Sequence, residues 1–547
     1  MRRADRHTIE HVGLPGTVLM ENAGAAVARL VAERFPQARD VVVLCGRGMN
    51  GGDGFVVTRR LGPGAEALLL GRREDIAGDA RVHLLACERS GGRVTEVPGP
   101  EAWPASLRRV EEADVVIDAV LGTGLRAAPS GLAALAIAAI RVRLGAGAPV
   151  VAVDLPSGVP SDSGTLDWPV AGATCTVTFA APKRGHVLPP ACDAIGELVI
   201  ADIGIPPASL AAAGPTLFLI EDEDAAAAFP PRGRGAHKGD FGHVLVVAGS
   251  MGKSGAAVLA ASGALRSGAG LVTVATPAAC LPLVAAARAE LMTEPLAVTA
   301  SGGLDQGELP RLLDLARERD AVVLGPGLGQ DPATRELVRG FVRACPVPLV
   351  IDADGLNALA PLGAEGQAVL RREAATILTP HPGEMARLTG RPTDEVQRDR
   401  AGTATALARE TGAIVVLKGA RTLVAEPAGR TAIVPCGNPG MATGGTGDVL
   451  AGVAGALLAR HGALLAATAA AFVHGRAGDL VARRKGEEGL TAGDVVEALP
   501  EAIEHVRSAA RRHICGGSPP KASRHIHGGS PPKASRHIRG GGPSASS

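Results

Sequence analysis

The chain has 547 residues, more than one hydrophobic core usually organises, so two or three domains are expected. Its 56 Lys and Arg nearly balance its 55 Asp and Glu, which leaves no basic field for nucleic acid or an acidic membrane. Aromatic residues make up only 2%, with no Tyr, so the cores must be built from Ala, Val and Leu and base stacking is largely excluded.

The N-terminus, MRRADRHTIE, lacks the apolar stretch of a signal peptide, and no apolar run reaches the ~18 residues of a membrane span. The 8 Cys are scattered without a C-x-x-C pair, which argues against a zinc site and a disulfide framework. We therefore expect a cytoplasmic protein with no membrane partner and no nucleic-acid partner.

From residue 1 to 212, short apolar runs alternate with helix-like stretches. Strands are expected at 41–45, 67–70, 114–121, 149–154, 175–180 and 197–202. Because these runs are continuously apolar, both faces of the sheet must be buried, which predicts a mostly parallel α/β domain. Ligands in such domains bind at the carboxyl ends of the strands.

Glycine-rich or polar turns follow three of these strands. They are GRGMNGGDG (46–54), DAVLGTGLR (118–126) and DLPSG (154–158). The three turns bring Asn50, Asp118, Asp154 and Ser157 toward one crevice, where their oxygens suit a hard cation. Each residue alone could be a loop group that caps a helix. The coincidence at three strand ends favours a site.

Residues 213–236 are expected to be a linker. The stretch 221–236 joins a charge run, an Ala tract and a Pro/Gly segment, as domain boundaries often do. We interpret the charge run as a solvated face.

A second α/β unit is expected over 237–510. Runs at 237–257, 321–329, 348–359, 375–387 and 413–422 each consist of a strand followed by a polar or glycine-rich turn. Asp352 and Asp354 follow one strand and could hold a metal or a substrate hydroxyl, or merely cap a turn. His381 lies between two prolines just before a helix, which favours a site residue. Lys418 ends a strand beside Gly419 and suits a phosphate contact.

The run NPGMATGGTGD (438–448) precedes a small, apolar helix expected to begin near Asp448. Its glycines can turn backbone N–H groups toward an anion, and the helix N-terminus adds positive potential. The Asp448 carboxylate would repel an anion, so it suits a base that takes a proton from a hydroxyl attacking a phosphoryl group. The alternative is a tight turn with Asp448 as N-cap.

The C-terminal segment 511–547 contains the repeat RHIxGGSPPKAS, which starts at Arg512 and again at Arg524. Two prolines and two glycines in twelve residues cannot form a packed core. A disordered basic tail is expected, either without function or binding metal weakly through its R-H-I units.

The first half resembles the NAD(P)H-hydrate epimerase family in LMENAG (19–24), MNGGDG (49–54), DAVLGTG (118–124), VDLPSG (153–158) and APKRGH (181–186). The second resembles ADP-dependent NAD(P)H-hydrate dehydratases in HKGDFG (237–242), SGAGLVT (267–273), GPGLG (325–329), TPHPGE (379–384), KGART (418–422) and GNPGMATGGTGD (437–448). Their order is that of fused bacterial repair enzymes. Three places depart: Met49 stands where the family usually has Asn, MGKS (251–254) where an aromatic is common, and the tail has no counterpart.

The resemblance implies a Rossmann-like three-layer domain followed by a ribokinase-like α/β domain. The first would interconvert the R and S hydrates of NADH and NADPH, NADHX and NADPHX. The second would dehydrate the S form to NAD(P)H while converting ADP to AMP and phosphate. It further implies K⁺ in the epimerase, Mg²⁺ in the dehydratase, ADP as co-substrate and a homo-oligomer.

The resemblance also assigns site residues. The catalytic residues would be Asp154 and Asp448, and the K⁺ ligands Asn50, Asp118 and Ser157. Contacts to the hydrate in the epimerase would come from Met49, Asn50, Gly51, Gly52, Asp53, Gly122, Thr123, Gly124, Leu125, Arg126 and Asp154. Contacts to the hydrate in the dehydratase would come from Ala256, Gly327, His381, Pro382, Gly383, Glu384, Met385, Ala386, Arg387 and Asp448. Contacts to the nucleotide would come from Lys418, Gly419, Ala420, Arg421, Thr422, Asn438, Gly444, Gly445, Thr446 and Gly447.

Two alternatives stay open. A ribokinase-like domain could instead phosphorylate a vitamin or sugar alcohol to a stable product. The first domain could be a binding module without catalysis.

Overall fold

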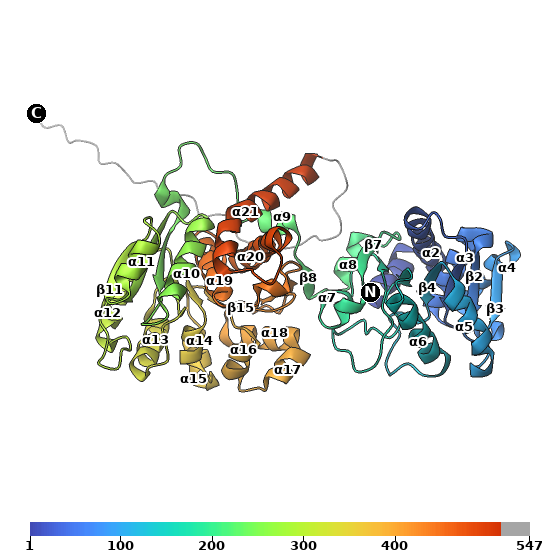
Figure 1. The fold of residues 1–547 in the computed structure, drawn as a ribbon, viewed down its shortest axis with the longest axis horizontal. Helices are drawn as coiled ribbons and strands as arrows, with labels where there is room; N and C mark the ends of the chain where they lie inside the picture. The colour runs from blue at the N-terminus through green and yellow to red at the C-terminus, as the bar shows by residue number, and fades with distance from the viewer. Residues whose placement is uncertain (516–547) are drawn as a thin grey trace, which may run out of the picture.

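In the computed structural model, which describes residues 1–515, the chain forms two α/β units that lie side by side (Figure 1). The N-terminal unit is built on a seven-stranded sheet in which every pairing is parallel. In sheet order the strands are β3 Arg93–Glu96, β2 Ala65–Leu69, β1 Val41–Cys45, β4 Val115–Ala119, β5 Val150–Val153, β6 Cys175–Phe179 and β7 Glu197–Ala201.

Helices cover both faces of this sheet. One face packs against α1 Arg2–His7, α2 Gly16–Arg34, α3 Met49–Leu61, α4 Gly78–Arg89 and α8 Pro207–Ala212. The other packs against α5 Trp103–Glu112 and α6 Gly131–Gly145. The strand order β3-β2-β1-β4-β5-β6 is that of a Rossmann fold, which confirms the three-layer expectation. The short helix α7 Arg184–Val187 faces the second unit, since Val187 belongs to that unit's core.

The second unit has a ten-stranded, mostly parallel sheet in which only β16 pairs antiparallel with its neighbours, β15 and β17. In sheet order the strands are β11 Met292–Leu296, β10 Leu271–Pro277, β9 His243–Val247, β12 Ala321–Leu324, β13 Leu349–Ile351, β14 Thr376–Leu378, β15 Ile414–Leu417, β16 Leu423–Ala425, β17 Thr431–Ile433 and β8 Leu217–Leu219. The second domain is therefore α/β, as expected.

Helices also cover both faces of the second sheet. The first face carries α9 Asp222–Ala226, α10 Ser254–Arg266, α11 Leu281–Ala287, α19 Thr446–Leu458, α20 Ala463–Lys485 and α21 Ala492–Cys515. The second carries α12 Leu309–Arg317, α13 Pro332–Ala344, α14 Asp354–Leu359, α15 Gly363–Leu370, α16 Pro382–Thr389, α17 Thr393–Arg398 and α18 Arg400–Thr411.

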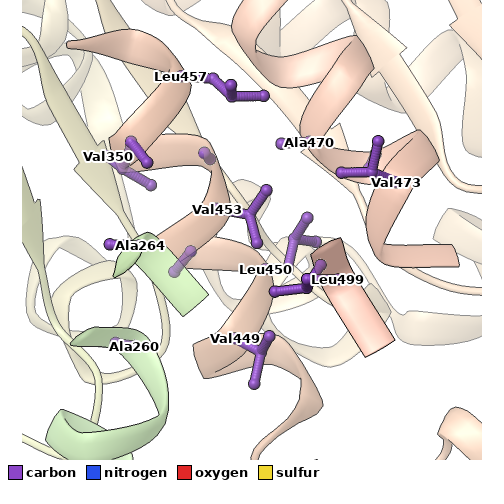
Figure 2. Packing of buried hydrophobic residues seen from close by; sticks show 14 of the residues in the cluster. Ala260, Ala264, Val350, Val449, Leu450, Val453, Leu457, Ala470, Val473 and Leu499 are labelled. Carbon is purple, nitrogen blue, oxygen red and sulfur yellow. The ribbon is translucent and has the colours of Figure 1, made fainter. Parts of the chain in front are cut away.

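Helix α19 lies at the centre of the first layer. Val449, Leu450, Val453 and Leu457 of α19 pack among α10, α20 and α21 (Figure 2). Glycines allow α10 and α19 to approach closely, because a Cβ on Gly452 would lie 1.9 Å from the carbonyl oxygen of Ala260. This packing fixes the N-terminus of α19, where Asp448 lies.

The expected linker, 213–236, differs from expectation. Strand β8 within it pairs parallel with β17 and completes the second sheet. The charge run forms α9, whose Asp222 pairs with Arg476 of α20 at 2.7 Å. Acidic residues in a first helical turn interact favourably with the helix dipole, so the run has a structural role. The second unit thus begins near residue 217.

The C-terminal end of the described chain is helical. Helix α21 continues to Cys515, beyond residue 511 where the tail was expected to begin. The rest of that tail, 516–547, lies outside the described residues. Within residues 1–515, the helices are too short or too polar to cross a membrane.

Two candidate active sites

The carboxyl ends of β1, β4 and β5 meet as predicted and gather the three expected oxygen ligands. Ser157 Oγ donates to Asp118 Oδ1 at 2.5 Å, and the Ser157 amide donates to Oδ2 at 2.7 Å. Asn50 lies beside the turn that follows β4, since a Cβ on Gly122 would be 3.2 Å from Asn50 Oδ1. Asp118 and Ser157 are fully buried, and Asn50 nearly so.

This group fits a cation. Among residues 1–515, no cationic side chain pairs with Asp118, and the Asn50 side-chain nitrogen has no hydrogen-bond partner. Burial raises the pKa of Asp118, although hydrogen bonds from Ser157 oppose that rise. A buried carboxylate without a basic partner is costly unless it is neutralised, and amide, carboxylate and hydroxyl oxygens suit a hard cation.

Asp154 follows β5 with an unusual backbone, a φ of 63°. Lys183 Nζ donates to its Oδ1 at 2.5 Å, and Thr178 Oγ1 donates to the same oxygen at 3.0 Å. Burial alone would raise the pKa of Asp154, but Lys183 outweighs it and holds that pKa below its usual value. Asp154 is therefore an ionised carboxylate held in a strained conformation, as functional residues often are.

His186 fixes the backbone of Asp154. The Lys183 amide donates to His186 Nδ1 at 2.9 Å, so the proton of the neutral ring lies on Nε2. Nε2 is 2.7 Å from the carbonyl oxygen of Asp154 and donates to it. Burial, with a contribution from Lys183, lowers the pKa of His186 to about 4, so the ring is neutral near pH 7.

Two further carboxyl groups face this cluster. Burial, with the charge of Asp154, raises the pKa of Asp53 well above its usual value, although Lys183 opposes the rise. Burial also raises the pKa of Asp5, which comes from α1. The site thus combines an ionised carboxylate, Asp154, with a carboxyl group of raised pKa, Asp53, a pairing that can divide acid and base roles.

The motif MNGGDG does not form the expected loop, because Met49–Leu61 is helix α3. Its glycines let α3 lie against the strand ends: a Cβ on Gly51 would be 1.8 Å from the carbonyl oxygen of Gly46. Asn50 and Asp53 therefore project inward from a helix, whereas Met49 is 56% exposed. In the turn 122–126, the backbone carbonyl of Thr123 accepts a hydrogen bond from the guanidinium of Arg2 in α1.

The second candidate site surrounds Lys418. Its Nζ lies 2.7 Å from Asp352 Oδ1 and 3.6 Å from Glu384 Oε2. Burial alone would lower the pKa of Lys418, but Asp352 and Glu384 outweigh it and raise that pKa. Thr379 Oγ1 also donates to Asp352 Oδ1 at 2.7 Å, whereas Oδ2 is buried without a partner. One oxygen of Asp352 is thus free for a further ligand.

Asp448 lies in the first turn of α19, and the N-cap is Gly445, with a φ of 92°. The alternative of Asp448 as N-cap is therefore wrong. Burial raises the pKa of Asp448 to about 7, with Asp352 and Glu384 adding to the rise and Lys418 opposing it. A carboxyl group with this pKa can accept a proton near neutral pH.

Gly447 allows the N-terminus of α19 to approach Lys418. A Cβ at Gly447 would lie 3.2 Å from Lys418 Nζ and 3.9 Å from Asp352 Oδ2. The ammonium group and the positive end of the helix therefore border one space, which suits an anion. Among residues 1–515, no cluster of three or more His, Cys, Asp or Glu side chains has metal-binding geometry.

His381, which the sequence favoured as a site residue, has a structural role. It caps α16, and its Nδ1 accepts from the amides of Gly383 at 3.0 Å and Glu384 at 3.3 Å. Its own amide donates to Glu384 Oε2 at 2.8 Å, which orients Glu384 toward Lys418. Met385, expected at the site, is fully buried in the core, so its side chain cannot reach a ligand there.

The remaining expected positions divide into two groups. Gly327 and Ala256 lie together, since a Cβ on Gly327 would be 2.8 Å from that of Ala256. Asn438 is engaged in its own turn: it accepts from the Gly440 amide and donates to Asp479 at 2.9 Å. Thr446 Oγ1 donates to the carbonyl of Met441 at 2.9 Å. These last two side chains shape the turn.

The sequence interpretation did not single out Lys183, His186 or Asp5. Lys183 and His186 belong to the APKRGH block that follows β6, so a fourth strand end was the available signal. No sequence signal marked Asp5, because nothing in the sequence indicates that α1 lies over the strand ends.

The fold and its two sites define a class: two-domain α/β enzymes with one candidate site on each sheet, one of which combines an ammonium group and a helix N-terminus with a buried carboxyl group. Family models match both parts, with the description "YjeF-related protein N-terminus" for residues 16–185 and "NAD(P)H-hydrate dehydratase" for residues 244–501. The chain belongs to the family of bifunctional NAD(P)H-hydrate repair enzymes.

Relatives match along nearly the whole chain. The bifunctional NAD(P)H-hydrate repair enzyme Nnr of Moorella thermoacetica is 41% identical, over 94% of this chain and 98% of its own length. That of Escherichia coli is 35% identical, over 92% of each. A crystal structure of the ADP/ATP-dependent NAD(P)H-hydrate dehydratase from Bacillus subtilis, co-crystallised with ATP and Mg²⁺, is 32% identical over 52% of this chain and 97% of its own, with a TM-score of 0.45.

Proposed function

We propose that the protein restores hydrated nicotinamide cofactors in two steps on one chain. The N-terminal domain interconverts the R and S epimers of NADHX and NADPHX. The C-terminal domain dehydrates the S epimer to NADH or NADPH and converts ADP to AMP and phosphate. The observation that carries the proposal is the convergence of Lys418, Gly447 and Asp448, which combines a phosphoryl-binding space with a base.

Dehydration needs a better leaving group than hydroxide. Asp448 accepts the proton of the ring hydroxyl, whose oxygen attacks the terminal phosphoryl group of ADP and displaces AMP. Lys418 and the backbone amides at the start of α19 stabilise the charge on the transferring phosphoryl group. The phosphate ester then leaves the ring as inorganic phosphate while the adjacent carbon loses a proton, which restores the double bond.

The substrates are assigned to opposite sides of Asp448. The hydrate lies toward Ala256, Gly327 and the 381–387 turn, and ADP lies toward 418–422 and 438–447. Arg421, at a φ of 54°, donates to the carbonyl of Pro435 at 2.9 Å, three residues before the second nucleotide segment. Asp352, through its unpartnered Oδ2, would hold the Mg²⁺ that neutralises the nucleotide phosphates.

Epimerisation requires inversion at the carbon that bears the hydroxyl. Water adds to the dihydronicotinamide double bond so that this carbon is also bonded to the ring nitrogen. Protonation of the hydroxyl by Asp53 releases water and leaves an iminium ion. Water then adds from the other face and gives its proton to Asp154, which Lys183 holds in place. Transfer of that proton back to Asp53 completes the cycle.

K⁺ in this domain is assigned to Asn50, Asp118 and Ser157, where it would neutralise a buried carboxylate. It would hold the ends of β4 and β5 against the start of α3, and so would fix the position of Asp154.

The proposed partners are the hydrates NADHX and NADPHX, ADP, and other copies of this chain in a homo-oligomer. The proposed location is the cytoplasm, where the scattered cysteines of this chain would stay reduced.

Product identity tests the proposal. The full chain is incubated with purified S epimer, Mg²⁺ and ADP, and AMP, phosphate and dihydronicotinamide absorbance are followed together. Equal amounts of all three are expected. A stable phosphorylated product would instead identify a kinase. Dependence on ATP with no reaction from ADP would contradict the assignment of the co-substrate.

A further inference from the structure

A cavity of about 1030 Å³ lies at the far end of α19 from Asp448. Its walls are the segment that precedes β9, the turn after α10, the turn after α19 and the middle of α21. Since α19 has 13 residues, its two ends are about 20 Å apart at ~1.5 Å per residue. This cavity is therefore distinct from the space beside Lys418.

Two guanidinium groups converge in this cavity. Arg232 Nη2 donates to the carbonyl of Gly268 at 2.9 Å, and Arg460 Nη2 donates to the carbonyl of Ser267 at 3.4 Å. A Cβ on Gly268 would lie 2.8 Å from Arg232 Nη2 and 3.8 Å from Arg460 Nη1. Both cationic groups thus border one small region of the wall.

Neither group is neutralised. Within residues 1–515, Arg232 and Arg460 form no ion pair, whereas two other arginines of the same wall do. Arg266 pairs with Glu497 at 3.1 Å, and Arg507 with Glu504 at 3.0 Å. Burial and the charge of Arg232 lower the pKa of Arg460, which shows that the two cations oppose each other. An anion between them would relieve that repulsion.

We propose that this cavity binds a phosphate-bearing small molecule, with its phosphoryl oxygens held between Arg232 and Arg460. The planar N–H fork of a guanidinium matches the oxygens of a phosphate group. Arg232 is already oriented, because its guanidinium stacks 3.8 Å from the ring centre of Phe241. Arg460 is held at the end of α19, where Nε donates to the carbonyl of Ala456 at 3.2 Å.

The chain's own C-terminal segment does not suit this role. Residues 516–547 contain Lys, Arg and His but no Asp or Glu, so they carry no anionic side chain.

Pyrophosphate is a suitable probe, and isothermal titration of the full chain can count its sites. Two classes are expected, one at Lys418 and one in this cavity. In Arg232→Met/Arg460→Met the cavity class should weaken at least ~10-fold, because each variant removes a charged hydrogen-bonding group. In Lys418→Met the cavity class should remain. Arg317→Met, on the exposed face of α12, is the matched control and should titrate as the unchanged chain.

Two results would overturn the proposal. One is an unchanged isotherm for Arg232→Met/Arg460→Met. The other is a single class in the unchanged chain that Lys418→Met removes. If the double variant fails to fold, the single variant Arg232→Met is titrated in its place, because Arg232 lies on an exposed segment and Arg460 is kept. Neither residue lies in the proposed active sites, so S-epimer dehydration without pyrophosphate should match the unchanged chain.

Discussion

Lys418 Nζ lies 2.7 Å from Asp352 Oδ1, and this pair determines how Asp448 behaves. Asp352 and Glu384 both approach the ammonium group of Lys418. Their negative charges largely compensate its positive charge, so Lys418 stabilises the ionised form of Asp448 only weakly. Burial therefore raises the pKa of Asp448 to about 7, with only partial opposition from Lys418. A carboxylate paired directly with Lys418 would stay ionised but would be a weaker base.

Replacing Asp448 by Asn should remove the base while keeping the shape of the site. We expect kcat for dehydration of the S epimer to fall about 10²–10⁴-fold, the range of general base catalysis. ADP affinity, measured by titration calorimetry, should change less than ~3-fold, because the nucleotide contacts are proposed elsewhere. Asp331→Asn, at the remote N-cap of α13, is the control. Full activity in Asp448→Asn would contradict the assignment.

The pH dependence follows from the same group. Because Asp448 must be deprotonated to act, kcat for dehydration should rise with pH through about 7 and then level off.

The contribution of Asp448 to the free energy of unfolding changes with pH in the opposite direction. A carboxyl whose folded-state pKa is raised above 3.8 contributes stability that is complete below pH 3.8 and lost as pH rises through about 7. Asp448→Asn should therefore be more stable than the unchanged chain at pH 8, by on the order of a few kcal/mol. The gain should shrink at pH 5. An equal difference at both pH values in urea unfolding would refute this.

Lys183 should be essential for epimerisation alone. Lys183→Met leaves Asp154 buried without its partner, so R/S equilibration should slow by about 10²-fold or more. The initial rate of S-epimer dehydration should not change. Chiral chromatography of the hydrate in an Asp448→Asn background isolates the first reaction. Lys238→Met, on the exposed segment before β9, is the matched control. Unchanged equilibration in Lys183→Met would remove this residue from the site.

Arg400 should position the nucleotide segment. Its buried guanidinium donates to the carbonyls of Ala420 at 2.5 Å and Lys418 at 3.1 Å, and burial lowers its pKa to about 10. Arg372 is a matched control, because it donates to the carbonyls of Cys345 and Val347 at 2.5 and 2.7 Å, away from the site. Both Met variants should lower Tm. Only Arg400→Met should raise the KM for ADP, by about 10-fold or more, with partial recovery in Arg400→Lys. Equal KM values in the two Met variants would show that Arg400 serves stability alone.

Removal of K⁺ should slow epimerisation. Exchanging KCl for tetramethylammonium chloride at constant ionic strength leaves Asp118 without a counter-charge. Asp118→Asn removes the buried charge, so its remaining epimerase rate should respond little to the exchange. A K⁺ response of the same size in Asp118→Asn would contradict the assignment of this ligand.

The sequence predicted many of the continuously apolar strands, but it missed β10 Leu271–Pro277, whose apolar residues are interrupted by Thr273 and Thr276. The run 41–45 is strand β1 Val41–Cys45, and the run 175–180 contains β6 Cys175–Phe179. Strands β3 Arg93–Glu96 and β11 Met292–Leu296 were not predicted, because both are edge strands and carry polar, partly exposed residues. Strand β8 was hidden in the expected linker, since its pairing partner β17 lies more than two hundred residues away.

Some site residues could likewise be predicted from the strand pattern, whereas others depend on tertiary packing. Asp118 near the end of β4 and Asp154 after β5 belong to one sheet, and Lys418 after β15 belongs to the other. Strand geometry alone therefore predicts that each lies at the carboxyl edge of its own sheet. Lys183 depends on the path of the chain after β6, and Asp5 on the packing of α1, which no local pattern encodes. The pKa of Asp448 depends on Asp352 and Glu384, which approach from two other elements.

Conversion of a mixed-epimer substrate tests the central claim, that one chain carries both activities. The hydrate is incubated with excess ADP and Mg²⁺, and dihydronicotinamide absorbance is followed to its end point. The unchanged chain should convert all of it, whereas Asp154→Ala should stop at the S fraction on the same time scale and Asp448→Asn should convert none. An unchanged chain that stops at the S fraction, or an Asp154→Ala chain that reaches completion as fast as the unchanged one, would contradict the account.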